Sequence, residues 1–288
     1  MMLKMIRSIL ISNVGKATMA LAAVATFPTI ARAAEAGDQI AVPAHNSATG
    51  AAGGLFANST FEIATGVDYS VGKYGAAVDT SVVSIPLDLK AQIGRLRLQA
   101  VLPYEFLKGP GQLVGGVVVT APGSTSAVKR NGLGDLNLSG AYLLNNEQGV
   151  LPAFEIGGGV KLPTAKTTIG TGKADYSLTA SAYKSLSPTV MLFGSVGYSW
   201  LGSPAAYQLN NGITASGGLN FRPKESQNYG VSVAYREPVA AGLQGQAVVS
   251  PYMTLRATKL LGFTLYGMAG FNDASPRWGA GIRLSLFQ

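Results

Sequence analysis

The chain has 288 residues and a formal net charge of +8, from 22 Lys and Arg against 14 Asp and Glu. It contains no Cys, which excludes disulfides and a lipid-modified N-terminal Cys. Charged residues make up only 12% of the chain, well below the ~25% of soluble globular domains. The basic residues are scattered singly, whereas a nucleic-acid footprint needs Lys and Arg clustered on one face. We therefore expect no nucleic-acid partner.

Residues 1–33 have the order of a secretory signal peptide. Lys4 and Arg7 precede an apolar run from Ala17 to Phe27, and Ala31-Arg32-Ala33 offers small residues for cleavage. An anchoring helix is the alternative, but the run is shorter than the ~20 residues that a spanning helix needs. We expect cleavage and export, followed by a flexible N-terminal tail over residues 34–59, which are rich in Ala, Gly and Asn.

From Thr60 onward, apolar residues recur at every second position in segments bounded by Gly, Pro, Asn or Ser. This alternation predicts strands with two unlike faces. The clearest case runs from Val190 to Trp200, where apolar side chains alternate with mostly small ones. About twelve strands are predicted, near residues 60–71, 79–90, 93–105, 132–144, 151–162, 174–186, 189–201, 212–223, 227–237, 247–257, 260–271 and 277–287. The predicted fold is all-β: a single transmembrane antiparallel β-barrel over residues 60–288.

The connections between these strands support the same fold. Every second connection is short, and the others are longer, above all residues 106–131. An even strand count with short periplasmic turns and long outer loops is typical of bacterial outer-membrane barrels, so we expect both termini on the periplasmic side. Aromatic residues should then form two girdles at the membrane interfaces. The predicted outer girdle is Tyr69, Tyr104, Tyr176, Trp200, Tyr235, Phe271 and Trp278, and the inner one is Phe61, Tyr142, Phe154, Phe221, Tyr229 and Phe263.

A soluble β-sandwich or a lipocalin-like barrel would also have alternating strands. In those folds the apolar face is the core, and the opposite face must carry enough charge to meet water. Here the polar face consists mainly of Gly, Ser, Thr and Asn. That face suits the interior of a membrane barrel better than a large soluble surface.

Charged residues on the polar faces should point into the barrel, because Arg or Lys facing lipid near the midplane costs about 2–4 kcal/mol. Two readings stay open for them: a pairing network that fills space, or the lining of a path for solutes. About twelve strands imply a narrow lumen, between the filled interior of eight and the open channel of 16 to 18. The predicted lumen-lining residues are Glu62, Asp68, Asp88, Arg95, Arg97, Asp135, Glu155, Lys161, Asp175, Arg222, Arg236, Arg256 and Arg283.

The segment from Leu113 to Thr120, within the longest connection, is unusually apolar for an outer loop. It could fold inward as a constriction or form an apolar entry site. The alternative is an extended hairpin above the membrane. The sequence does not separate these possibilities.

Catalytic and cofactor motifs are not found. The one histidine, His45, precedes the first strand, so a Ser-His hydrolase built into the barrel wall would lack its base. Zinc sites with His or Cys ligands are missing for the same reason. Gly170 to Asp175 is only faintly similar to a phosphate-binding loop, because GxxxxGK[ST] is absent and a strand follows instead of a helix. We expect no enzyme activity, no cofactor and no metal.

Three segments resemble a family of outer-membrane proteins catalogued under the MetA pathway of phenol degradation: Gly132 to Leu144, Gly157 to Leu186 and Leu192 to Gly202. The shared elements are a Gly-x-Gly-Asp strand start, a Leu-Pro-Thr turn, a Gly-x-Gly-x-x-Asp-Tyr strand entry and a Gly-Tyr near a strand end. The resemblance implies an outer-membrane barrel for uptake of hydrophobic or aromatic compounds. It carries over no binding residues. The final Gln288 departs from the aromatic end usual in such barrels, which implies weaker recognition by the barrel assembly machinery.

The resulting expectation is an outer-membrane channel for passive passage of small molecules, with hydrophobic and aromatic solutes among the candidates. A closed structural or adhesive barrel that acts through its outer loops is the alternative. Expected partners are outer-membrane lipid, the barrel assembly machinery and a small-molecule solute. The sequence does not specify the substrate, the gating or the oligomeric state.

Overall fold

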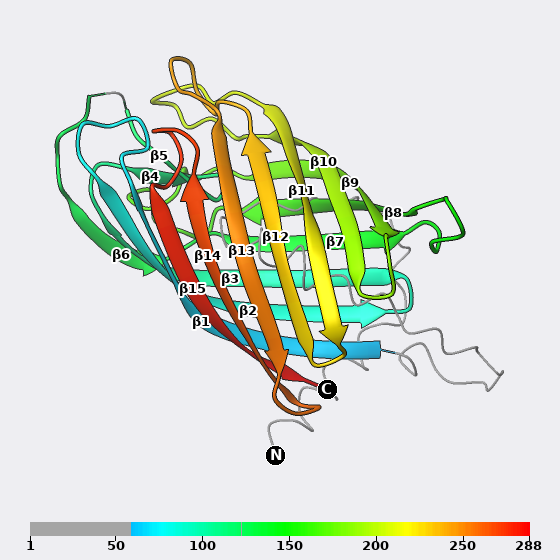
Figure 1. Ribbon diagram of the computed structural model, residues 1–288. Coiled ribbons are helices and arrows are strands. Elements are labelled where there is room, and N and C mark those ends of the chain that lie inside the picture. Colours follow the sequence, from blue (N-terminus) through cyan, green and yellow to red (C-terminus); the bar gives the residue numbers. More distant parts are fainter. Residues whose placement is uncertain (1–58, 122) are drawn as a thin grey trace, which may run out of the picture.

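The computed structural model in Figure 1 describes residues 59–121 and 123–288. The predicted signal peptide lies outside these residues, as does the predicted tail except for Ser59, which begins the first strand. In the described part of the chain, no helix is long and apolar enough to cross a membrane. Its strands are β1 (Ser59–Gly72), β2 (Thr80–Ile93), β3 (Leu96–Lys108), β4 (Gln112–Val114), β5 (Val117–Val119), β6 (Lys129–Leu133), β7 (Leu136–Leu143), β8 (Ala153–Leu162), β9 (Asp175–Ser185), β10 (Val190–Trp200), β11 (Gly212–Lys224), β12 (Gln227–Arg236), β13 (Gln246–Arg256), β14 (Leu261–Gly270) and β15 (Trp278–Phe287).

The strands other than β4 and β5 form one antiparallel sheet that closes into a barrel (Figure 1). Neighbours in sequence pair with one another, and β1 pairs with β15 to complete the ring. Strands β6 and β7 both pair with β3, one along each half of it, so together they occupy one position in the wall. The described chain therefore forms a closed barrel with 12 strand positions, which confirms the predicted fold class.

The predicted strand near residues 132–144 is the one that differs most from the structure. It starts earlier, at Lys129, and is interrupted at Gly134 and Asp135. The Gly134 amide donates to the Pro103 carbonyl at 2.8 Å, and a Cβ at Gly134 would lie only 2.7 Å from the Pro103 ring. Because Pro103 has no amide hydrogen to donate, the regular ladder with β3 breaks at this point.

Short and long connections separate at the two ends of the barrel. Five connections lie at one end of the barrel, here called the short-turn end: β2–β3, β7–β8, β9–β10, β11–β12 and β13–β14. All of these except β7–β8 are tight turns. The first residues of β1 and the last of β15 lie at that same end, where Glu62 pairs with Phe287. The longer connections lie at the opposite, long-loop end. Which end faces the periplasm stays a prediction.

Alternation gives the wall strands an apolar outer face and a less exposed inner one, although the outer positions of β6 include Lys129 and Asn131. On β1 the outward Ile63 is 53% exposed, whereas the adjacent inward Ala64 is 1% exposed. Aromatic rings gather on the outer face near both ends. Tyr69 and Trp278 lie 5.1 Å apart, centroid to centroid, near the long-loop end, and Phe221 and Tyr229 lie 6.5 Å apart near the short-turn end. An apolar band between aromatic girdles is the surface that a bilayer solvates.

Several inward glycines make room for an aromatic ring on the neighbouring strand. Phe193 lies over its cross-strand partner Gly218, and Tyr266 lies over Gly281 in the same way. A Cβ on Gly281 would lie 2.5 Å from the Cε1 atom of Tyr266, closer than real Cβ atoms approach other atoms. The high glycine content of this chain therefore serves, in part, to seat bulky side chains inside a narrow barrel.

We expect Gly281→Ala to lower the free energy of unfolding by about 1–3 kcal/mol, because the new methyl group must displace the Tyr266 ring. Urea unfolding of the protein refolded in phospholipid vesicles would measure this. Gly194→Ala is the matched control, since its nearest non-neighbouring atom would be the Ser216 carbonyl oxygen at 3.6 Å; its effect should stay within about 0.5 kcal/mol. Equal stability of the two variants would contradict the close packing.

Candidate functional site

The apolar segment of the longest connection forms a small hairpin, β4–β5, at the long-loop end (Figure 1). Gly115 and Gly116 make its turn with φ values of 53° and 81°, the left-handed backbone that a two-residue hairpin turn requires. The hairpin valines are buried: Val114 packs with Leu201 and Leu209, and Val118 packs with Val82 and Leu107. Since Val82 and Leu107 point inward from the wall, the hairpin lies inside the barrel, and the alternative of an extended hairpin above the membrane is wrong.

Hydrogen bonds from several parts of the barrel hold this hairpin in place. At its turn, Arg236 Nη1 donates to the Gly115 carbonyl at 2.7 Å. Along β5, Gln246 Nε2 donates to the Val118 carbonyl at 3.0 Å. At its base, the Gly111 amide donates to Thr80 Oγ1 at 3.1 Å. Thr80 is on β2 and Arg236 is on β12, on a different side of the ring, so the hairpin extends across the lumen.

One group of the predicted lumen-lining residues forms a buried ion-pair cluster around Lys161. Its Nζ lies 2.8 Å from Asp135 Oδ2 and 3.2 Å from Asp175 Oδ2. The remaining carboxylate oxygens accept from loop amides: Asp135 Oδ1 from Ala165 at 2.9 Å, and Asp175 Oδ1 from Gly202 at 2.8 Å. The cluster thus joins the wall to the long loops, and two loops depend on it for their position.

A second group lies on another part of the ring, on β1, β2 and β15. Lys90 Nζ is 3.7 Å from both Glu62 and Asp88, and the Arg283 guanidinium is 3.6 Å from Asp88 and 3.9 Å from Asp68. Asp88 is completely buried between these two cations. These residues form a continuous chain of alternating charges along the inner face.

The other predicted residues are spread toward the short-turn end. Arg97 pairs with Glu155 at 2.6 Å on the inner face. Arg95 is exposed in the β2–β3 turn, where it donates to the Leu144 carbonyl. Arg222 is half-buried on β11. Arg256 is exposed, and its guanidinium lies 4.1 Å from the centroid of the Phe287 ring. The predicted set therefore separates into pairs and clusters and does not converge on one site. Three uncharged inner residues that bind the carboxylates were missed, although they share the same period-2 register: Gln99, Tyr183 and Tyr266.

Among residues 59–121 and 123–288, no group of three or more His, Cys, Asp or Glu side chains is arranged to hold a metal ion. The inner surface instead offers separate ion pairs, a crossing hairpin and hydroxyl groups. Such a surface can bind or guide a polar or weakly polar solute.

Comparison with protein families shows which family this chain belongs to. A family model described as "Putative MetA-pathway of phenol degradation" matches residues 72–286. The chain belongs to this family. The match covers most of the barrel and confirms the resemblance noted in the segments from Gly132 to Gly202. No curated protein matches the chain.

Solved structures share the fold at very low sequence identity. The NanC porin has a TM-score of 0.51 at 7% identity, covering 78% of this chain and 98% of its own. The translocator domain of the autotransporter NalP from Neisseria meningitidis has a TM-score of 0.48 at 9% identity, covering 90% and 94%. The monoaromatic hydrocarbon channel CymD has a TM-score of 0.39 at 10% identity, covering 80% and 87%. At these identities the likeness concerns the fold: this chain has the architecture of an outer-membrane β-barrel.

Proposed function

We propose that this protein is an outer-membrane channel through which small molecules pass passively, and that the β4–β5 hairpin narrows its lumen. The observation that carries the proposal is the hairpin itself, held across the inside of the barrel by Arg236 and Gln246. A loop folded into a polar lumen restricts the size of what can pass. The short-turn end would face the periplasm and the long loops the exterior, as in bacterial barrels generally.

The solute would be small, because a barrel of this size has little interior volume to spare. Small aromatic molecules are the first to test, since the family description concerns phenol degradation. The inner surface holds its charges in pairs, such as Arg97 with Glu155, which favours neutral or weakly charged solutes over multiply charged ones. The protein would act without catalysis and without a cofactor.

A closed structural or adhesive barrel is the second candidate. The packing of Tyr74, Leu107 and Ile169 with the hairpin residue Val118 favours it, because this buried apolar cluster fills part of the barrel interior at the long-loop end. In that case the loops, and not the lumen, would carry the function.

Channel activity would be tested with the purified chain refolded into liposomes and planar bilayers. We expect small conductance steps, and liposome swelling that is faster with glycerol than with a disaccharide, because the constricted lumen excludes bulky solutes. Protein-free liposomes and liposomes with heat-unfolded protein are the controls. A folded protein that gives neither conductance nor swelling would contradict the proposal and favour the closed barrel.

A further inference from the structure

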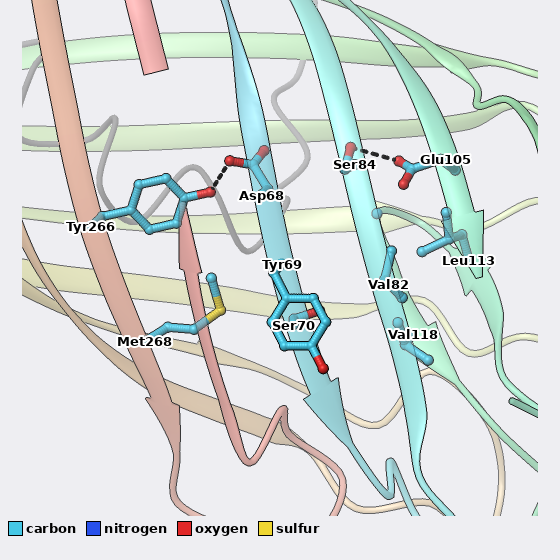
Figure 2. A pocket seen from close by; sticks show the side chains of 11 residues that line it. Asp68, Tyr69, Ser70, Val82, Ser84, Glu105, Leu113, Val118, Tyr266 and Met268 are labelled. Atoms are coloured by element: carbon cyan, nitrogen blue, oxygen red, sulfur yellow. Dashed lines mark hydrogen bonds between the residues drawn. The ribbon is translucent and has the colours of Figure 1, made fainter. Parts of the chain in front are cut away.

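A small cavity lies between the β4–β5 hairpin and the inner wall formed by β1, β2, β3 and β14 (Figure 2). Its volume is about 70 Å³. Its lining contains both polar and apolar side chains. The polar side chains are Asp68, Ser70, Ser84, Glu105 and Tyr266, and the apolar ones include Val82, Leu113, Val118 and Met268.

Glu105 is the unusual group in this cavity. It is only 6% exposed, and its Oε1 accepts a hydrogen bond from Ser84 Oγ at 3.1 Å (Figure 2). Its other oxygen, Oε2, is buried and has no hydrogen-bond partner in the described chain. No basic side chain of the described residues forms an ion pair with it, in contrast to Asp68. A buried carboxyl oxygen without a donor is costly unless the group is protonated or a ligand supplies the donor. A cationic donor beside Glu105 would satisfy this oxygen and favour the ionised carboxylate.

The charges around the cavity show what kind of donor fits. Asp68 shares Arg283 with Asp88, and Asp88 shares Lys90 with Glu62. Adding Glu105 gives an excess of carboxylates over cations on this part of the wall. On the opposite side, Lys161 and Arg236 balance Asp135 and Asp175. The cavity therefore lies at the acidic side of the lumen, where a cation is attracted and an anion repelled.

We propose that this cavity binds the primary ammonium group of a short alkylamine, which makes such amines a solute class for this channel. An ammonium group donates up to three hydrogen bonds, and Glu105 Oε2 would accept one of them. The short alkyl chain would contact Val82, Leu113 and Met268. At about 70 Å³ the cavity is smaller than the enclosed cavity of ~150 Å³ that holds a benzene ring, which favours a short alkyl chain over an aromatic ring. This inference rests on the proposed channel function, because the solute must reach the lumen.

Calorimetric titration of the refolded protein in a non-ionic detergent with ethylammonium chloride tests the site. We expect ethylammonium to bind, and ethanol, acetate and potassium ion to bind at least about tenfold more weakly, because only the ammonium supplies both charge and oriented donors beside an apolar tail. Glu105→Gln should weaken ethylammonium binding about tenfold. The same change at Glu147, a partly exposed carboxylate in the β7–β8 connection far from the cavity, is the matched control and should leave binding unchanged.

The ligand comparison on the unaltered protein needs no variant to fold. Equal binding of ethanol and ethylammonium would overturn the proposal, as would unchanged affinity in folded Glu105→Gln. If the channel conducts but ethylammonium does not bind, the amine site is wrong and the channel function stands. If ethylammonium binds but neither conductance nor swelling is seen, the channel function is wrong and the binding site stands.

Discussion

Replacement of Lys161 by Met is expected to lower the free energy of unfolding of the barrel by about 3–5 kcal/mol, because it removes one partner of a buried ion cluster. The side chains of Lys161 and Asp175 are 3% and 0% exposed. Without the ammonium group, Asp135 and Asp175 would face each other in a water-poor interior, and the Arg236 guanidinium, which interacts electrostatically with Asp175, would be the counter-charge that remains. The loop amides of Ala165 and Gly202 would still donate hydrogen bonds to the two carboxylates.

Guanidinium unfolding in detergent, followed by tryptophan fluorescence, measures this loss. Lys184→Met is the control: Lys184 pairs with Glu147 at the short-turn end, and its side chain is 26% exposed. Such a partly exposed surface pair should contribute much less than the buried cluster, about 0–1 kcal/mol. Adding Asp135→Asn and Asp175→Asn to Lys161→Met should recover part of the stability, since it removes the unpaired charges. A Lys161→Met barrel as stable as the original would show that the cluster does not stabilise the fold.

The positions of the wall strands could be predicted because the two solvents of a membrane barrel impose period 2. Lipid on one side and lumen on the other leave no strand free to shift by one residue without reversing both faces. The segment 189–201 was predicted, and β10 runs from Val190 to Trp200. The strand boundaries differ from the predicted ones where local chemistry interferes. At Gly134, for example, Pro103 on the facing strand interrupts the hydrogen-bond ladder.

The partners of the inner charges could not be predicted in the same way. Period 2 tells which face a side chain occupies, but not its height or its neighbour, which depend on the stagger between strands. Arg95 and Arg256 share the inward register with Lys161, yet they lie near the short-turn end, and Lys161 lies at the centre of a buried cluster. The contact between Arg236 and Gly115 joins residues 121 positions apart and has no local signature.

The direction of the apolar loop was also undetermined from the sequence. Its Val-rich composition suits burial, but burial above the membrane against other loops would satisfy it equally well. Two features decide that the loop folds inward. The lumen is wide enough to admit a two-stranded hairpin, and inward-facing side chains bind the hairpin's carbonyl groups. Arg236 and Gln246 supply those groups, and both come from strands far along the chain.

Removal of the hairpin is expected to raise the single-channel conductance several-fold, because it takes away the structure that crosses the lumen. Residues 110–127 can be replaced by a short Gly-Ser linker with little strain. Lys108 and Lys129 already pair across β3 and β6, and the Gly109 amide donates to the Val128 carbonyl at 3.0 Å. The wall should therefore still close, and faster swelling with larger solutes should accompany the higher conductance.

The same linker inserted after Gly149 provides the control, because this position lies at the short-turn end and an added Cβ there would meet no atom within 4 Å. Its conductance should equal that of the unaltered protein. Loss of the hairpin also frees Arg236, whose charge would then face the open lumen close to Asp175. If the shortened barrel folds, as shown by its heat-dependent mobility in gels, and conducts no better than the control, then the constriction lies elsewhere. The hairpin would then close the long-loop end structurally and would not limit passage.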